Sequence, residues 1–443
     1  MLKGYFFQFV DLLYGSMVLM LGILVVFVTI WFLPIFFPNV DFSGFTKSFQ
    51  ILYNTAPVWA PIFFGSIFIK NWMTYIRTEF IIKEGSVLLE IKVPKETLKS
   101  PLAMEIFFTS LYQTGSATYI ETYWKGKVRP WFSLELVSIE GQVKFFIWTM
   151  KKYRNLIEAQ LYAQYPTIEI YEAEDYMGWI HKPDPVNWPM WATYFKFTKP
   201  HVYPIKTYVD YGLHENPKEE FKVDPMTSVI EYLGSMRKGE HVWIQIIIQA
   251  HRVLKLKDGV LFKTHDWKHQ AEHEIEHIRE KSITESHGDF PGMPNPTKGQ
   301  QNTIAALERS ISKFPFEACI RGCYIAKKES FNPISITGLI GSFRQYSSND
   351  DLNGFKLGWF TDFDYPWQDF RRMRRTHAEF EMLEAIKLRS FFQPPFKNFE
   401  GSPIILNTEE LATIFHFPGS VAGTPGFVRL PSKRVEPPAN LPI

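Results

Sequence analysis

The stretch WFSLELVSIEGQVKFFIWT, residues 131–149, shows the architecture of the chain most clearly. Two runs typical of strands flank the dipeptide Glu140–Gly141, which favours the tight turn of a hairpin. The sequence therefore predicts two antiparallel strands, Trp131–Ile139 and Val143–Thr149. Such a hairpin needs further strands and helices to bury its apolar side chains.

Strand and helix patterns surround this hairpin. Before it, Val87–Val93 reads as a strand, and Ser100–Pro101 opens a helix because serine caps free amides and proline suits the first helical position. After it, Tyr153–Tyr165 is helical and Thr167–Tyr171 forms a last strand. The order β-α-β-β-α-β predicts a ferredoxin-like lobe over residues 79–180.

A second lobe of the same kind is expected over residues 190–328. Asp224–Pro225 starts a helix, and the following strand HVWIQIIIQAHR (241–252) has an apolar centre too continuous for a surface strand. A polar, histidine-rich insertion covers about 254–299. A helix and a strand, Asn302–Lys313 and Phe316–Ala326, complete the lobe.

The C-terminal region, 329–443, is less regular but still mixes helices and strands, so we assign the whole body to the α+β class. Three helices are expected there, one capped by Asn332–Pro333, one over Trp367–Phe392, and one over Thr408–Phe417 with Asn407 and Glu410 as its capping box. A proline-rich tail follows.

The N-terminus, 1–78, is expected to be a transmembrane hairpin. No charged residue occurs from Leu12 to Val40 or from Ile51 to Ile69, and a helix needs about 20 apolar residues to cross a bilayer. We expect two spanning helices, about 12–37 and 51–70. A single spanning helix with an interfacial or buried apolar segment is the alternative, and a cleaved signal peptide does not fit this length.

Basic residues set the expected orientation. Lys70, Arg77 and Lys83 follow the second apolar run, and positive charge stays on the cytoplasmic side. The sequence therefore predicts a multi-pass protein of the cell (inner) membrane, with its C-terminal body in the cytoplasm.

Composition excludes several classes of protein. The chain has 443 residues, with 48 basic and 46 acidic ones, so it is neither a disordered tail protein nor a strongly cationic nucleic-acid binder. Its 2 cysteines exclude a disulfide-built scaffold. Cys319 and Cys323 are too far apart along one predicted strand to bridge, so we expect core thiols.

The string HQAEHEIEHIRE (269–280) contains the most suggestive motif. On a helix, His269, His273 and His277 lie four residues apart and could share a zinc ion, with a glutamate activating water. The flanking sequence is polar, so we interpret the string as a solvated insertion helix rather than a metal site. The alternative is a zinc-dependent membrane hydrolase.

Motifs for other chemistries are missing from the sequence. It contains no GxxxxGK[ST] phosphate loop, no GxSxG nucleophile elbow and no GxGxxG fingerprint. We therefore predict no catalytic residue, no cofactor-binding residue and no cofactor, and we do not expect an enzyme.

The densest basic run is FRRMRR, with Arg371, Arg372, Arg374 and Arg375. We interpret it as a solvated helix face that Glu379, Glu381 and Glu384 neutralise. The alternative is a site for an anionic partner, either DNA phosphates or an anionic lipid surface.

Several longer blocks carry a resemblance to a known family. They are LLEIKVPKETLKSPLAMEIFF (88–108), KKYRNLIEAQLYAQYPTIEI (151–170), FRQYSSNDDLNGFK (343–356), WQDFRRMRRTHAEFEMLEAIKLRSFF (367–392), ILNTEELATIFHFPG (405–419) and EPPANLP (436–442). From Glu79 on, the chain resembles a membrane-anchored family of unknown function from genome-reduced candidate-phyla bacteria. The same body resembles the N-terminal, non-motor region of type IV secretion and conjugative DNA-transfer ATPases. There, the segment matching EPPANLP leads into the P-loop motor, whereas this chain stops.

The resemblance implies a non-catalytic, membrane-anchored component of a type IV secretion-like or DNA-transfer apparatus. Its cytoplasmic body would dock a separately encoded P-loop motor ATPase, through the 400–443 region. The expected partners are the lipid bilayer, this motor and further copies of the chain, with direct nucleic-acid contact left open. A membrane scaffold without an ATPase partner is a further alternative.

Overall fold

The computed structural model describes residues 21–22, 25, 43–94, 99–115, 117–180, 184, 186–213, 223–254, 266–282, 295–348, 351–363 and 365–418. The chain divides into two compact units. The first comprises Met1–Lys83, Ala117–Val128 and Gln393–Lys397, and the second comprises Glu84–Ser116, Arg129–Phe392 and Asn398–Ile443. All the described strands belong to the second unit.

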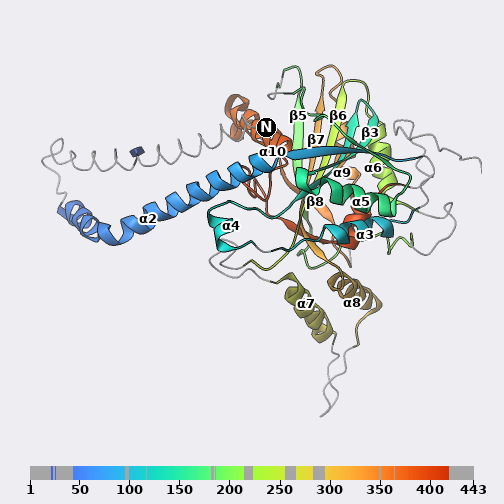
Figure 1. Cartoon of the computed structure of the whole chain (residues 1–443), viewed down its shortest axis with the longest axis horizontal. Helices are drawn as coiled ribbons and strands as arrows, with labels where there is room; N and C mark the ends of the chain where they lie inside the picture. Colours follow the sequence, from blue (N-terminus) through green and yellow to red (C-terminus); the bar gives the residue numbers. More distant parts are fainter. Residues whose placement is uncertain are drawn as a thin grey trace, which may run out of the picture. The chain divides into compact units, whose positions relative to one another are not determined.

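Most of the described residues of the first unit belong to helix α2, Ser43–Glu84 (Figure 1). Its segment Gln50–Glu84 is 35 residues long and apolar enough to cross a membrane. The predicted span 51–70 lies inside this helix. The other predicted span, 12–37, falls outside the described residues apart from Leu21, Gly22 and Val25. Where two spanning helices were expected, the described part of the chain thus contains one candidate.

A short loop and helix pack against α2 within this unit. The indole Nε1 of Trp72 donates a hydrogen bond to the carbonyl of Tyr123, which ends helix α4, Tyr119–Tyr123, at 2.8 Å. Gly126 follows with a φ of +63°, and a Cβ there would lie 2.2 Å from the Ile76 carbonyl oxygen. Glycine therefore allows the loop to close on the helix.

The second unit is built on one nine-stranded sheet in which all the pairings are antiparallel. Its strand order is β4-β1-β3-β2-β6-β7-β5-β8, and β9 pairs with one end of β7. The strands are β1 Ser86–Lys92, β2 Phe132–Ile139, β3 Gln142–Met150, β4 Glu169–Glu172, β5 Met190–Phe197, β6 Glu240–Ala250, β7 Pro315–Ala326, β8 Phe355–Phe360 and β9 Ile404–Asn407.

The sheet consists of two halves with the same strand order. From one edge the first half reads β4-β1-β3-β2, and from the other edge the second half reads β8-β5-β7-β6. If the strands of each half are numbered in chain order, both halves read fourth, first, third, second from the edge to the centre of the sheet. The halves join where β2 pairs with β6, from Phe132 opposite Ile248 to Ile139 opposite His241. Instead of two separate lobes over 79–180 and 190–328, the structure thus has one continuous sheet, to which β8 adds a strand from beyond residue 328.

The predicted hairpin is confirmed as β2 and β3. Glu140 and Gly141 both have positive φ values, 52° and 86°, as the tight turn of a hairpin requires. A Cβ at Gly141 would lie 2.5 Å from the Met236 carbonyl oxygen, so this position also needs glycine for a close approach.

The predicted central strand is confirmed as well. Every residue of β6 is buried, and the strand lies between β2 and β7. Its continuous apolar centre fits a strand covered on both faces.

The second unit also contains helices, some packed on the sheet and two, α7 and α8, away from it (Figure 1). These helices are α3 Leu102–Leu111, α5 Arg154–Gln164, α6 Pro225–Gly234, α7 Trp267–Lys281, α8 Lys298–Ile311, α9 Pro333–Gly341, α10 Met373–Lys387 and α11 Thr408–Ile414, with short 3-10 turns at Lys151–Tyr153, Arg344–Tyr346, Pro366–Gln368 and Phe370–Arg372.

The main core lies on one face of the sheet. Buried residues of α3, α5, α6, α9 and α11 pack there with alternate residues of the strands, such as Leu134, Leu136 and Ile246. The opposite face carries Glu135 and Gln245 and is met by the C-terminal end of α10, because the Gln245 amide donates to the Ile386 carbonyl at 3.1 Å. Each face of the sheet centre is therefore buried.

Helices α7 and α8 form a smaller cluster of their own. Ala271, Ile275 and Ile278 of α7 pack against Ile304 and Leu307 of α8. Helix α7 lies in the predicted insertion, about 254–299, of which residues 255–265 and 283–294 lie outside the described part of the chain. Helix α8 corresponds to the helix predicted over Asn302–Lys313.

Candidate functional site

The prediction of one long helix over Trp367–Phe392 is wrong, and the arginine run crosses the start of a shorter helix. Helix α10 begins at Met373, and the carboxylate of Asp369 accepts hydrogen bonds from the amides of Arg374 and Arg375 at 2.8 and 3.0 Å. The preceding Arg371 and Arg372 have left-handed backbone conformations, with φ of 55° and 58°. Capping by Asp369 thus fixes the start of the helix after the first two arginines.

The expected neutralisation of the arginines is only partly found. Glu379 pairs with Arg375 at 2.8 Å, and Asp362 contacts the same guanidinium at 2.9 Å. The other two expected acids pair elsewhere: Glu381 with His377, and Glu384 with Lys387, both at 3.4 Å.

Large aromatic side chains lie exposed among these arginines. Trp367 is 78% exposed and Phe370 68%, and the rings of Trp367 and Tyr365 stack with centroids 4.7 Å apart. Exposed apolar groups of this size mark interaction sites when they gather together. We call this set the arginine–aromatic surface, defined by Tyr365, Trp367, Phe370, Arg371, Arg372, Met373, Arg374 and Phe380.

The three histidines lie on the outward side of α7. His269 and His273 are exposed, and His277 is half-buried with its Nδ1 3.7 Å from a carboxylate oxygen of Glu274. The Glu274 carboxylate also accepts a hydrogen bond from the hydroxyl of Tyr203. Among the described residues, no group of three or more His, Cys, Asp or Glu side chains is placed to hold a metal ion.

The apolar side of α7 is wider than its sequence indicated. Besides Ile275 and Ile278, it buries Trp267, whose indole donates to the His201 carbonyl at 3.2 Å, and Ala271. Packing against α8 therefore holds this helix.

Replacing Ile275 with alanine should therefore release α7, whereas replacing His273 with alanine should not. Removal of a buried isoleucine costs about 2 kcal/mol or more, while an exposed side chain contributes within about 0.5 kcal/mol. We expect amide hydrogen exchange in α7 to accelerate roughly 30-fold in the first variant and to stay unchanged in the second. Equal release by His273→Ala, together with loss of bound zinc from the preparation, would show instead that the histidines hold a metal.

A buried charge network joins β2 to the segment after α10. The guanidinium of Arg389 contacts Glu135 at 2.9 Å and Asp175 at 2.5 Å, and both Arg389 and Glu135 are fully buried. Glu135 also accepts from Tyr176 and Gln245, at 2.9 and 3.1 Å. The two acids raise the pKa of Arg389 even though burial opposes its charge, so the guanidinium stays protonated.

A second buried cation, Arg321, lies on the same face of the sheet. It pairs in register with Gln245 on β6, and its guanidinium lies over the rings of Tyr194 and Phe391, 5.4 and 5.8 Å from their centroids. One of its nitrogens donates to the Ser390 carbonyl. The segment after α10 is thus held by two buried arginines.

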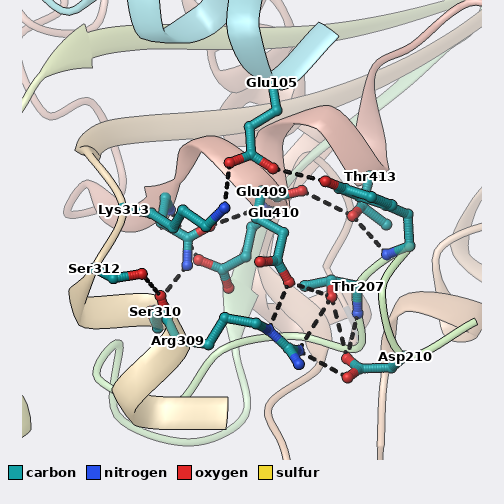
Figure 2. A network of polar contacts seen from close by, with 12 residues as sticks. Glu105, Thr207, Asp210, Arg309, Ser310, Ser312, Lys313, Glu409, Glu410 and Thr413 are labelled. Atoms are coloured by element: carbon teal, nitrogen blue, oxygen red, sulfur yellow. Dashed lines mark hydrogen bonds and ion pairs between the residues drawn. The ribbon is translucent and has the colours of Figure 1, made fainter. Parts of the chain in front are cut away.

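A second polar network, on the main-core face, connects α3 and α11 with α8 and the residues just after it (Figure 2). Arg309 contacts Glu409 at 3.0 Å and Asp210 at 2.7 Å. Lys313 contacts Glu105 at 2.6 Å. Three helices distant in sequence are therefore joined through paired charges.

Glu410 is the innermost acid of this network. Its two carboxylate oxygens accept from the amides of Ile205 and Asn407 at 2.9 and 2.8 Å, which confirms the predicted capping box. Burial nevertheless raises the pKa of Glu410 to about 8.

His416 carries a further buried charge pair at the end of this segment. Burial alone disfavours a charged imidazole, but the carboxylate of Asp224, 3.1 Å from its Nε2, outweighs it and raises the pKa of His416. Burial raises the pKa of Glu409 as well, so Glu409, Glu410 and His416 all bind protons more strongly than usual.

Both cysteines are buried, free thiols on β7, as expected. Burial raises the pKa of the Cys319 thiol to about 11 and raises that of Cys323 as well. Both therefore stay protonated and poorly nucleophilic at neutral pH.

A family model described as "Domain of unknown function (DUF8128)" matches residues 80–426. The chain belongs to this family. The DUF8128 domain takes in the whole sheet, both buried charge networks and the arginine–aromatic surface, and it begins inside the last turns of α2. A comparison with curated proteins gives no match.

Sequence reasoning missed most of the buried charges of the DUF8128 domain. Glu135 sits in the predicted hairpin and Arg389 in the predicted long helix, but no spacing relates residues 254 positions apart. Two signals could have been noticed: an ionisable residue inside an apolar strand, and an arginine without a nearby acid in the sequence.

Proposed function

We propose that this protein is a membrane-attached, non-catalytic platform of a type IV secretion-like or DNA-transfer apparatus, which docks a separately encoded P-loop motor ATPase. The observation that carries the proposal is the direct connection between α2 and the sheet. The candidate spanning helix ends at Glu84, and β1 begins at Ser86 with only Gly85 between them. The covalent link through Gly85 therefore ties the sheet to any membrane that α2 enters.

The repeated strand order supports a platform built from two ferredoxin-like halves. In a unit of this type the strands follow the order fourth, first, third, second, with both crossover helices on one face. Here α3 and α5 share one core with α6 and α9, so equivalent helices of the two halves pack on the same face of the sheet. The continuous sheet makes the body one stiff support.

Charge near the end of α2 supports a cytoplasmic body. Lys70, Arg77 and Lys83 follow its apolar segment, as the distribution of basic residues in inner-membrane proteins requires. We propose an inner-membrane location, a second span within 12–37, and assembly of several copies around the motor.

The motor contact is assigned to residues 419–443. The preceding residues 404–417 are buried, and α11 packs in the main core through Leu411. These buried residues cannot meet another protein without opening the fold. Within the expected 400–443 docking region we therefore assign the contact to the tail rather than to 404–417, which the exposed residues 400–402 precede in the sequence.

A pull-down tests this proposal. The tagged full-length protein, solubilised in detergent, should capture a P-loop ATPase, identified by mass spectrometry. Deletion of residues 419–443 should abolish the capture. A variant that carries the same 25 residues in scrambled order should also fail to capture the ATPase.

The possible results separate the alternatives. If no ATPase is captured by the intact protein, the motor platform is wrong and a scaffold without a motor replaces it. If the scrambled tail still captures the ATPase, the assignment of the contact to the tail sequence is wrong.

A further inference from the structure

The arginine–aromatic surface combines two properties that surfaces of folded domains rarely combine. Its apolar members are strongly exposed, with Met373 at 61% and Phe380 at 40% besides Trp367 and Phe370. Its cations Arg371, Arg372 and Arg374 are also exposed. Burying these aromatic rings against a partner would remove a large apolar area from water.

Among the described residues, the acids near this surface are engaged with other groups. Asp369 is engaged with the helix amides, Asp362 and Glu379 with Arg375, and Glu381 with His377. The guanidinium of Arg371 lies 5.1 Å from the ring centroid of Phe370, and that of Arg374 lies 4.9 Å from the centroid of Phe363. Arg374 also donates from Nη1 to the Gln368 carbonyl at 2.9 Å, and the charge of Arg372 acts on Glu379. Three cations thus face solvent together with the rings.

The backbone presents this charge in an unfavourable place for stability. The arginines stand at the N-terminus of α10, where the helix dipole is already positive and acidic residues are the stabilising ones. Arg371 and Arg372 also adopt a left-handed conformation that costs about 1 kcal/mol or more for a side chain with a Cβ. Because Arg371 and Arg372 both carry these costs in stability, we expect their positive charges to serve in binding an anionic ligand.

We propose that the arginine–aromatic surface binds the headgroup region of an anionic lipid bilayer. Tryptophan and tyrosine rings and the long stems of arginine are the side chains that settle at membrane interfaces, and basic residues add attraction to anionic lipid. Stacking of Tyr365 on Trp367 and the cation contact on Phe370 each take up one face of a ring, which leaves fewer faces on which bases could stack. The same chain carries a candidate spanning helix, so a bilayer is close at hand.

This inference goes beyond the proposed function and needs no motor. The test uses the full-length protein held in neutral-lipid nanodiscs, with an environment-sensitive dye on His377→Cys, which lies beside the surface and is exposed. The native Cys319 and Cys323 are buried, so labelling is confined to position 377. Added vesicles carry nitroxide lipid as a quencher and contain either neutral lipid alone or about 30% phosphatidylglycerol.

We expect the dye to be quenched by the anionic vesicles and not by the neutral ones, with loss of quenching in about 0.5 M salt. The variant R371Q/R372Q/R374Q should bind the anionic vesicles roughly 100-fold more weakly, since each basic residue near such a surface strengthens binding about fivefold. The matched control K268Q/K281Q/K298Q removes three exposed charges from α7 and α8 and should bind normally. Trp367→Ser with Phe370→Ser should also weaken binding to the anionic vesicles at low salt, because the apolar contact with the headgroup region is lost.

Two results would overturn the proposal. One is a lack of charge dependence, seen as equal quenching by neutral and anionic vesicles or as an equal loss of binding in the control K268Q/K281Q/K298Q. The other is a dye response to a single-stranded oligonucleotide, but not to anionic vesicles, that depends on the three arginines, because the surface would then be a nucleic-acid site.

Discussion

Replacing Arg389 with methionine should lower the free energy of unfolding by roughly 3–5 kcal/mol, among the largest effects expected of a single substitution in this protein. The reason is electrostatic. The guanidinium and the Glu135 carboxylate are both fully buried, and without Arg389 that charge stays in the interior without a counterion. Urea unfolding of the full-length protein in detergent, followed by tryptophan fluorescence, measures the loss, because Trp131 lies in this region and donates to the Arg389 carbonyl.

Two further variants test the cause. Arg279→Met removes an exposed cation that pairs with the exposed Glu308 outside this network, and it should cost less than about 1 kcal/mol. The double variant E135Q/R389M removes both buried charges and should recover a substantial part of the loss. If it is no more stable than R389M alone, the unpaired carboxylate is not the cause.

Raising the pH from 6 to 9 should destabilise the α11 segment through Glu410. The folded state holds the Glu410 proton up to about pH 8, whereas the unfolded chain releases it near the ordinary value of 4.5. Between these values the folded state binds more protons, so stability falls as the pH rises and levels off above pH 8. The loss between pH 6 and 9 is roughly 2–3 kcal/mol for this group.

His416 acts in the same direction. Its pKa is raised in the folded state, so its contribution is fully present below the ordinary histidine value of 6.5 and is lost as the pH rises through the folded value. The pKa of Asp224 is lowered, and the stability it contributes is lost only in acid, outside this range. Glu410 and His416 therefore both make the folded state more stable at pH 6 than at pH 9.

Glu410→Gln should flatten this pH dependence, because glutamine keeps a capping side chain at the same helix position and does not titrate. Urea unfolding at intervals from pH 6 to 9 measures the slope for both proteins. Glu308→Gln, which changes an exposed acid on α8, serves as the control and should keep the original slope. An unchanged slope in Glu410→Gln would mean that the carboxyl is ionised throughout the range.

The sequence by itself determined the local elements. The β2–β3 hairpin follows from Glu140–Gly141 between two strand patterns, and the central strand β6 follows from its continuous apolar run. The caps at Asn332 and at Asn407 with Glu410 were also read correctly, since the side chains involved are within three residues of the amides they bind. Local order is encoded in neighbouring residues, which is why these patterns could be recognised.

Tertiary structure decided what these elements do together. The sequences of β2 and β6 give no sign that these two strands pair, or that their pairing joins the two halves of the sheet. Arg389 takes a left-handed conformation just past α10, where glycine is usual, because its side chain must reach Glu135 from 254 residues away. Likewise, whether a histidine on α7 or an arginine before α10 faces solvent depends on which other side chains bury the opposite face. Contacts between distant residues carry no local period, and only the folded chain brings them together.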